Sequence, residues 1–339
     1  MADTKINGAL FQSMVTEGAL AITEQKEQIN ELNVFPVPDG DTGTNMSMTM
    51  TAAMNELAKL SEPTLAKAAD TTASALLRGA RGNSGVILSL LFRGISKELK
   101  GCKEADGAAF AAALQEGVAA AYNAVMKPAE GTILTVLRDV STKADECEKK
   151  KFAAEDALDA IVVEAYQSVA RTPDLLPVSR LAAERAASAA EEQNSVEYVI
   201  EQAIAQGEIT LAQTTDMNPV LKKAGVVDAG GKGFLLILSG MLSALRGEER
   251  PELTEENAQE KADFAMLNEE DITFTFDTVF IVRKSGRSIE PFRRFLDGIG
   301  DSLVIGEDDE AFKVHVHTDI PGEALTEAQK YGTLELAKI

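Results

Sequence analysis

The spacing of apolar residues predicts that the first two thirds of the chain is helical. From residue 6 to residue 245, apolar positions recur every three or four residues, and no alternating run appears before about residue 270. The clearest stripe joins Met46, Met50, Ala53, Met54 and Leu57. Similar patterns, each bounded by Gly, Pro or a capping residue, predict helices over 64–78, 84–99, 106–126, 132–148, 154–170 and 233–245. These elements predict a helical bundle.

The segment 180–217 has a weaker pattern than its neighbours. It is rich in Ala and Glu, and its apolar residues are less regularly spaced. We interpret it as a helical insertion at the periphery of the bundle, within a helical domain that spans residues 1–247. A charged stretch follows, which we interpret as a linker over 248–270.

The periodicity changes after the linker. Residues 272–282 are β-branched and aromatic, and shorter runs at 302–305 and 312–317 have the same character, which predicts three strands. Residues 289–299 read as a helix between the first and second of them. The expected fold class is therefore mainly α, with a helical domain followed by a small α+β domain over 271–339.

Charge narrows the range of partners. The 339 residues contain 33 Lys and Arg against 54 Asp and Glu, a net charge of −21, which repels a nucleic-acid backbone. We expect no nucleic-acid partner, and a phosphate ligand would have to meet metal ions or backbone N–H groups. The two cysteines have no CxxC spacing, and no apolar run reaches membrane-spanning length. These features predict a cytoplasmic protein.

The most informative motif is the stretch 32–46. Prolines at 36 and 38 stiffen it, and Asp39 and Asp41 follow two residues apart, so that their carboxylates can point to one side. Two close carboxylates suit Mg²⁺, and the helix that begins at 42–45 offers N–H groups and hydroxyls to an anion. The alternative is an ordinary turn followed by a helix N-cap.

Two further Gly-rich stretches lie at 79–85 and 225–233. In the first, small residues would let a phosphate reach the backbone around Asn83 and Ser84; the alternative is a tight helix connection with one of them as N-cap. The second does not have the spacing of a P-loop. His315 and His317, the only histidines, alternate on a predicted strand and so face the same way. They suit a metal pair or a metal-plus-catalyst pair; the alternative is two structural histidines.

Four motifs in order (33–46, 82–89, 130–134 and 224–233) resemble the ATP-binding subunit of bacterial fatty acid kinase. Its nucleotide domain is similar to the L-subunit of dihydroxyacetone kinase. The resemblance implies a barrel of antiparallel helices with Mg–ATP at one end. It is interrupted by the segment 180–217, and it implies a C-terminal partner-binding domain beyond Ile339, so that the chain is expected to be either a fragment or a short form.

The resemblance also implies roles for individual residues. Two Mg²⁺ ions would be held by Asp39, Asp41 and Asn33, the last standing one residue out of register with a family Asp. The residues that would bind the phosphates of ATP are Thr42, Gly43, Thr44, Asn45, Asn83 and Ser84. Those that would border its ribose and adenine are Thr132, Ile133, Asp228, Ala229 and Gly230. In the second domain, the family has a Cys that suits zinc together with the His-x-His pair, and here Asp277 stands at that position, which predicts a weaker zinc site.

The function implied by the resemblance is transfer of the γ-phosphoryl group of ATP to a fatty acid carboxylate, giving an acyl-phosphate for phospholipid metabolism. A DegV-type fatty-acid-binding partner would present the acid, and His315 or His317 would orient it or stabilise the transferring group. A homodimer is also compatible with the sequence. Two alternatives stay open: a kinase that acts on dihydroxyacetone, and a non-catalytic nucleotide-sensing regulator.

Overall fold

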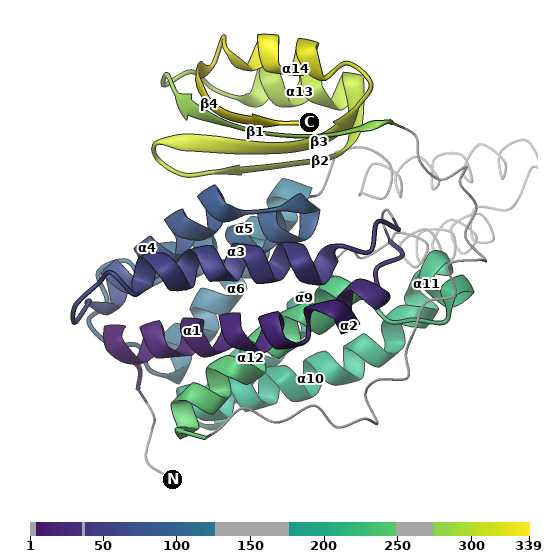
Figure 1. The fold of residues 1–339 in the computed structure, drawn as a ribbon. Coiled ribbons are helices and arrows are strands. Elements are labelled where there is room, and N and C mark those ends of the chain that lie inside the picture. The colour runs from purple at the N-terminus through teal and green to yellow at the C-terminus, as the bar shows by residue number, and fades with distance from the viewer. Residues whose placement is uncertain (1–4, 36–37, 126–175, 249–273) are drawn as a thin grey trace, which may run out of the picture. The chain divides into compact units, whose positions relative to one another are not determined.

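The computed structural model describes residues 5–35, 38–125, 176–248 and 274–339, and within them the predicted mainly helical fold is confirmed (Figure 1). The helices before residue 126 are α1 (Gly8–Glu24), α2 (Lys26–Glu31), α3 (Thr42–Leu57), α4 (Leu65–Gly79), α5 (Gly82–Glu98) and α6 (Gly107–Val125). Those after residue 175 are α9 (Pro177–Glu192), α10 (Val196–Met217), α11 (Pro219–Ala224) and α12 (Ala229–Arg246). The helices predicted over 132–148 and 154–170, and most of the predicted linker 248–270, lie outside the described residues.

Small residues allow the helices to pack closely. Where α1 contacts α12, a Cβ atom on Gly240 would lie 2.5 Å from the carbonyl oxygen of Glu17, so only glycine fits without moving the backbone. The apolar stripe predicted on α3 is buried at Met46, Met50 and Leu57. Among the described residues, no helix has both the length and the apolar character that crossing a bilayer would require.

The segment 180–217 is helical, as expected, but its predicted peripheral position is corrected by its burial. It forms most of α9 and all of α10, and Val199, Ile200 and Ala203 of α10 are fully buried. The helix α10 packs against both α9 and α12. The weak apolar pattern arises because these helices bury mainly alanine and other small side chains, which contribute little to a hydrophobic stripe. The two helices therefore form part of the core of the helical domain.

The C-terminal region is the expected small α+β domain. Its strands β1 (Phe276–Lys284), β2 (Gly300–Glu307), β3 (Ala311–Thr318) and β4 (Gly332–Lys338) form one antiparallel sheet in the order β2-β3-β1-β4. The helix α13 (Glu290–Ile299) was predicted, whereas α14 (Pro321–Ala328) and β4 were not. Strand β1 begins at Phe276, four residues later than predicted.

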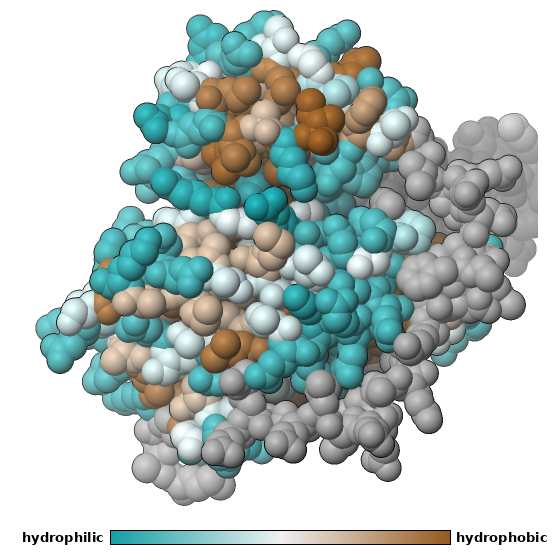
Figure 2. All heavy atoms as spheres, in the orientation of Figure 1, coloured by the Kyte–Doolittle hydropathy of each residue, from teal (hydrophilic) through white to brown (hydrophobic). Residues whose placement is uncertain are grey.

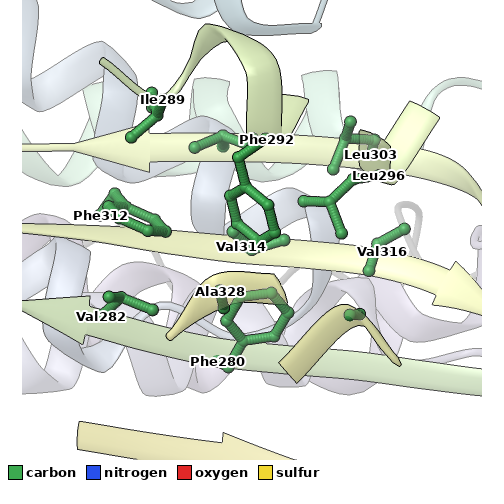
Figure 3. Close-up of a cluster of buried hydrophobic side chains, with 12 residues drawn as sticks. Phe280, Val282, Ile289, Phe292, Leu296, Leu303, Phe312, Val314, Val316 and Ala328 are labelled. Carbon is green, nitrogen blue, oxygen red and sulfur yellow. The ribbon is translucent and has the colours of Figure 1, made fainter. Parts of the chain in front are cut away.

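The helices α13 and α14 cover one face of this sheet. Figure 3 shows Phe292 of α13 standing over Phe280, Val314 and Phe312 of the strands. The ring centroids of Phe292 and Phe312 are 5.8 Å apart, and all four side chains are fully buried. The hydrophobic core of this region therefore lies on the helix-covered face, and the residues that alternate with it, His315 and His317 among them, belong to the other face.

Strand β4 carries exposed hydrophobic side chains on the face of the C-terminal region that Figure 2 draws. Figure 2 shows brown spheres gathered there, and Leu336 and Ile339 are among the exposed large hydrophobic side chains. Within the part of the chain that the structure describes, strand β4 pairs with β1 alone and so lies at the edge of the sheet.

Candidate functional site

The first turn of α3 is capped by two asparagines that precede it in sequence. Asn33, which is buried, accepts a hydrogen bond from the Thr42 backbone N–H at 3.0 Å and also contacts the Thr42 hydroxyl. Asn30 accepts from the Thr44 N–H at 3.0 Å and donates to the Thr44 hydroxyl at 2.9 Å. Two of the amides expected to meet a phosphate are therefore already satisfied by side chains.

Asp39 and Asp41 lie next to each other at the start of α3, as the sequence predicts. Asp41 is the N-cap residue of this helix, yet its side chain makes no capping hydrogen bond. Although Asp39 retains an exposed surface, desolvation of its carboxyl group, the negative charge of Asp41 and a hydrogen bond with Asp41 together raise the pKa of Asp39 to about 7. A hard divalent cation between the two carboxylates would relieve this repulsion, so the pair fits Mg²⁺.

The corner between α4 and α5 lies against α3. The hydroxyl oxygens of Thr42 and Ser84 are 3.4 Å apart, and the Arg81 N–H donates to Thr49 Oγ1 at 3.2 Å. Gly82 has a φ of +54°, and a Cβ atom there would lie 2.3 Å from the Asn45 Nδ2 atom. Helix α5 begins at Gly82, with Arg81 as its N-cap, so neither Asn83 nor Ser84 is an N-cap. The structure therefore brings the two predicted phosphate motifs together. The Asn83 side-chain oxygen is buried there and has no hydrogen-bond partner among the described residues.

Of the residues predicted to border ribose and adenine, Asp228 caps α12. Its carboxylate accepts hydrogen bonds from the N–H groups of Gly230 and Gly231, both at 3.0 Å, and its own N–H donates to Thr214 Oγ1 at 2.9 Å. Burial raises the pKa of Asp228. Ala229 and Gly230 form the first turn of α12, where Ala229 is buried, whereas Thr132 and Ile133 lie outside the described residues.

A second candidate site lies on the sheet. Asp277, His315 and His317 place one potential metal-ligand atom each within 4.8 Å of one another. The two Nε2 atoms of the histidines are 3.2 Å apart, and His315 Nδ1 is 3.3 Å from Asp277 Oδ1. Burial, followed by the nearby His317 and Lys313, lowers the pKa of His315 to about 3, so this imidazole is neutral, as a metal ligand must be. Burial also raises the pKa of Asp277.

Two residues near these sites were not found from the sequence. Asp301 of β2 lies with its Oδ1 3.6 Å from His317 Nδ1. Lys313 of β3 is buried, and its ammonium donates to the Arg78 carbonyl at 3.3 Å and to the Ala80 carbonyl. Burial, with the nearby Arg81, lowers the pKa of Lys313 to about 8. A lysine in a strand pattern does not indicate burial. The sequence showed only that Lys313 alternates with His315 and therefore belongs to the same face of the strand.

Comparison with known proteins agrees with this architecture. A DAK2 domain matches residues 36–187 and 178–243, and the middle domain of FakA-like fatty acid kinases matches residues 273–339. Protein YloV of Bacillus subtilis is 39% identical over 351 residues, which cover 100% of this chain and 56% of that protein. An uncharacterized protein of Staphylococcus epidermidis is 39% identical over 346 residues, 99% of this chain and 55% of its own length.

The chain thus spans about half the length of these curated relatives. The two family matches divide it where the fold changes from helices to the sheet. On this evidence the chain belongs to the DAK2-domain family, with a middle domain of the FakA-like fatty acid kinase type after its helical domain.

Proposed function

We propose that the helical domain binds Mg–ATP at the start of α3 and that the chain transfers the γ-phosphoryl group to a fatty acid carboxylate. The family supports a kinase-related phosphotransferase function. The observation that carries the finer proposal is the meeting of the two motifs: Asp39 and Asp41 precede α3, and Thr42 of that helix faces Ser84 of α5 at 3.4 Å.

Each group has a distinct task in this proposal. Mg²⁺ held by Asp39 and Asp41 would neutralise the charge of the phosphates, and the hydroxyls of Thr42 and Ser84 would orient them. Because Asn30 and Asn33 occupy the amides of Thr44 and Thr42, hydroxyl and carboxylate oxygens supply more of the site than helix N–H groups do. For Asn33 to reach a metal ion, its Oδ1 would have to turn away from Thr42.

The acceptor and the partner follow from the family resemblance. A fatty acid carboxylate is already ionised near pH 7 and needs no general base, which fits a site whose acidic groups are better suited to holding a cation. A DegV-type protein would present the acid, and His315 or His317 would orient it. A dihydroxyacetone-type acceptor is the second candidate, supported by the DAK2-domain match.

The central test is calorimetric titration of Mg–ATP into the parent chain and into Asp39→Asn and Asp41→Asn. Both substitutions keep the size of the side chain and remove one metal-binding charge, so we expect each to weaken Mg–ATP binding at least tenfold. Asp70→Asn is the matched control, because it makes the same change at an exposed carboxylate of α4 whose nearby charge is the ammonium of Lys67, with Asp70 Oδ2 3.7 Å from Lys67 Nζ. The Asp70→Asn variant should bind Mg–ATP as the parent does. Parental affinity in both site variants would refute the metal assignment.

Turnover then separates the acceptors. ATP consumption that depends on a fatty-acid-loaded DegV-type protein supports the carboxyl kinase, and consumption that depends on dihydroxyacetone supports the second candidate. Binding of ATP without turnover with either acceptor would instead indicate a nucleotide-sensing regulator. If His315 or His317 acts on the acceptor, its alanine variant should lose turnover while it retains Mg–ATP affinity.

A further inference from the structure

Lys313 of β3 is a buried cation that the proposed phosphoryl transfer does not use. Among the described residues it is the only lysine or arginine that is buried, with 2% of its surface exposed. Its ammonium donates to two backbone carbonyls, that of Arg78 at 3.3 Å and that of Ala80. Since a buried ammonium is costly unless its donors are satisfied, these two bonds fix where the end of the side chain can lie.

The two carbonyls lie at the C-terminal end of α4. This helix ends at Gly79, with Ala80 as its C-cap. The last carbonyls of a helix have no N–H partner within the helix, and they carry the negative end of its dipole. An ammonium suits both properties, so a lysine from the sheet caps a helix that belongs to the helical domain.

The α4–α5 corner, residues 80–85, follows this cap directly. Arg81, the residue after Ala80, donates its N–H to Thr49 Oγ1 of α3 at 3.2 Å, and Ser84 comes three residues later. One backbone group of the corner is therefore bonded to α3, and its neighbour is bonded to β3. The position of the Ser84 hydroxyl depends on both of these attachments.

The strands around Lys313 approach α4 and α5 closely. Gly306 of β2 pairs with Lys313, and a Cβ atom added to Gly306 would lie 2.9 Å from Leu77 Cδ1 of α4 and 3.5 Å from Val86 Cγ1 of α5. The sheet and the helices α1 to α5 belong to one compact unit. Packing around Gly306 therefore holds the sheet beside the corner, and the hydrogen bonds of Lys313 fix the direction of the two carbonyls.

We propose that Lys313 is a positioning residue for the nucleotide site, which holds the α4–α5 corner where Asn83 and Ser84 can meet phosphates. The proposal rests on the Mg–ATP site proposed above and adds the sheet to it, because the C-terminal region then supports nucleotide binding without contacting the nucleotide. Packing alone does not require an amine here, since an apolar side chain of similar size would avoid its desolvation cost.

The first test is the Lys313→Met variant of the full chain, which keeps the length of the side chain and removes its N–H donors. Hydrogen–deuterium exchange without nucleotide should be about tenfold faster over residues 80–86 than in the parent, because lost hydrogen bonds make local opening easier. Exchange in α1 and α12 should stay parental, which a general loss of stability would not allow. Calorimetry should show Mg–ATP binding weakened about tenfold, with circular dichroism confirming that the variant is folded.

Two comparisons separate positioning from general packing. Gly306→Ala pushes Leu77 aside in the same contact and leaves the carbonyl bonds of Lys313, so it should lower the stability to urea but change Mg–ATP affinity less than about twofold. Aminoethylation of a Lys313→Cys variant, whose two natural cysteines are first replaced by alanine, rebuilds an amine on a side chain of nearly lysine length. This chain should regain the affinity of the cysteine-free chain that keeps Lys313.

The proposal is overturned if Lys313→Met keeps either the exchange or the Mg–ATP affinity of the parent. It is also overturned if Gly306→Ala weakens Mg–ATP binding as much as Lys313→Met does, or if the aminoethylated chain stays as weak as Lys313→Met. A parent chain that binds no Mg–ATP would be a failure of the proposed function instead. Exchange over residues 80–86 would then decide by itself whether Lys313 positions the corner.

Discussion

Replacing Gly82 by alanine tests whether the α4–α5 corner and the start of α3 form one site. Gly82 is in the left-handed region, at φ +54°, and an added Cβ atom would lie 2.3 Å from Asn45 Nδ2. Because the first atom in the way is the end of a side chain, Asn45 can move, but it must leave its present position beside the phosphate-binding candidates. The variant should therefore fold and bind ATP poorly.

The expected loss of stability has two parts. An alanine in the left-handed region costs about 1–2 kcal/mol. A normal contact distance of about 3.4 Å requires Asn45 to retreat by roughly 1 Å, and turning it off its rotamer costs about 1 kcal/mol more. Gly247 is the matched control, since it has a φ of +63° and no described residue has an atom within 4 Å of its added Cβ. Gly247→Ala should then show the backbone cost alone.

Urea unfolding followed by circular dichroism measures the stability of both variants, and calorimetry measures their affinity for Mg–ATP. Gly82→Ala should be less stable than Gly247→Ala by about 1 kcal/mol and should bind Mg–ATP at least tenfold more weakly, whereas Gly247→Ala should keep parental affinity. Equal Mg–ATP affinity in the two variants would refute the reasoning, because displacement of Asn45 would then not affect the nucleotide.

Two further predictions concern pH and the segment 180–217. The pKa of Asp39 is raised to about 7, so Mg²⁺ and a proton compete for its carboxylate near neutral pH. The affinity for Mg–ATP, measured by calorimetry, should therefore increase as the pH rises from 6 to 8. An affinity that does not change with pH would contradict the assignment of this carboxylate to the metal. Deleting residues 180–217 and closing the gap with a short Gly-Ser linker should abolish cooperative unfolding of the helical domain, because the deletion removes the fully buried Val199 and Ile200. A stable deletion protein that binds ATP would show instead that the segment is dispensable.

Periodicity was sufficient to predict the larger elements. The stripe from Met46 to Leu57 and the Thr64 cap, whose hydroxyl accepts from the Lys67 N–H, locate α3 and α4 within a few residues. The C-terminal elements α14 and β4 escaped for a physical reason. Within α14 only Ala324 and Ala328 are buried, and β4 is exposed along most of its length with only two leucines in alternation, so the apolar signal of each is too short to be distinctive.

Contacts between distant positions could not be predicted in the same way. Asn30 caps Thr44 from fourteen residues upstream, and no local capping motif relates the two. Asp301 lies on the same face as His317 only because β2 contains an extra residue, and simple alternation from Val304 would have assigned it to the opposite face. A bulge of this kind leaves no glycine or proline as a signal, because the residue in the left-handed conformation is Ser302.

The two interpretations of the motif at the start of α3 make different demands on its carboxylates, and the structure bears on one of these demands, the capping role of Asp41. An ordinary turn with an N-cap requires the Asp41 side chain to bond to the helix amides, yet Asn30 and Asn33 do so instead. The pKa of Asp39 is raised first by desolvation and then by the nearby charge of Asp41, and Asp41 makes no capping hydrogen bond that would offset this repulsion. A bound cation would offset this repulsion. Under the proposed function, the same caps would leave phosphates to reach this helix mainly through hydroxyls and metal ions, because few amides remain free.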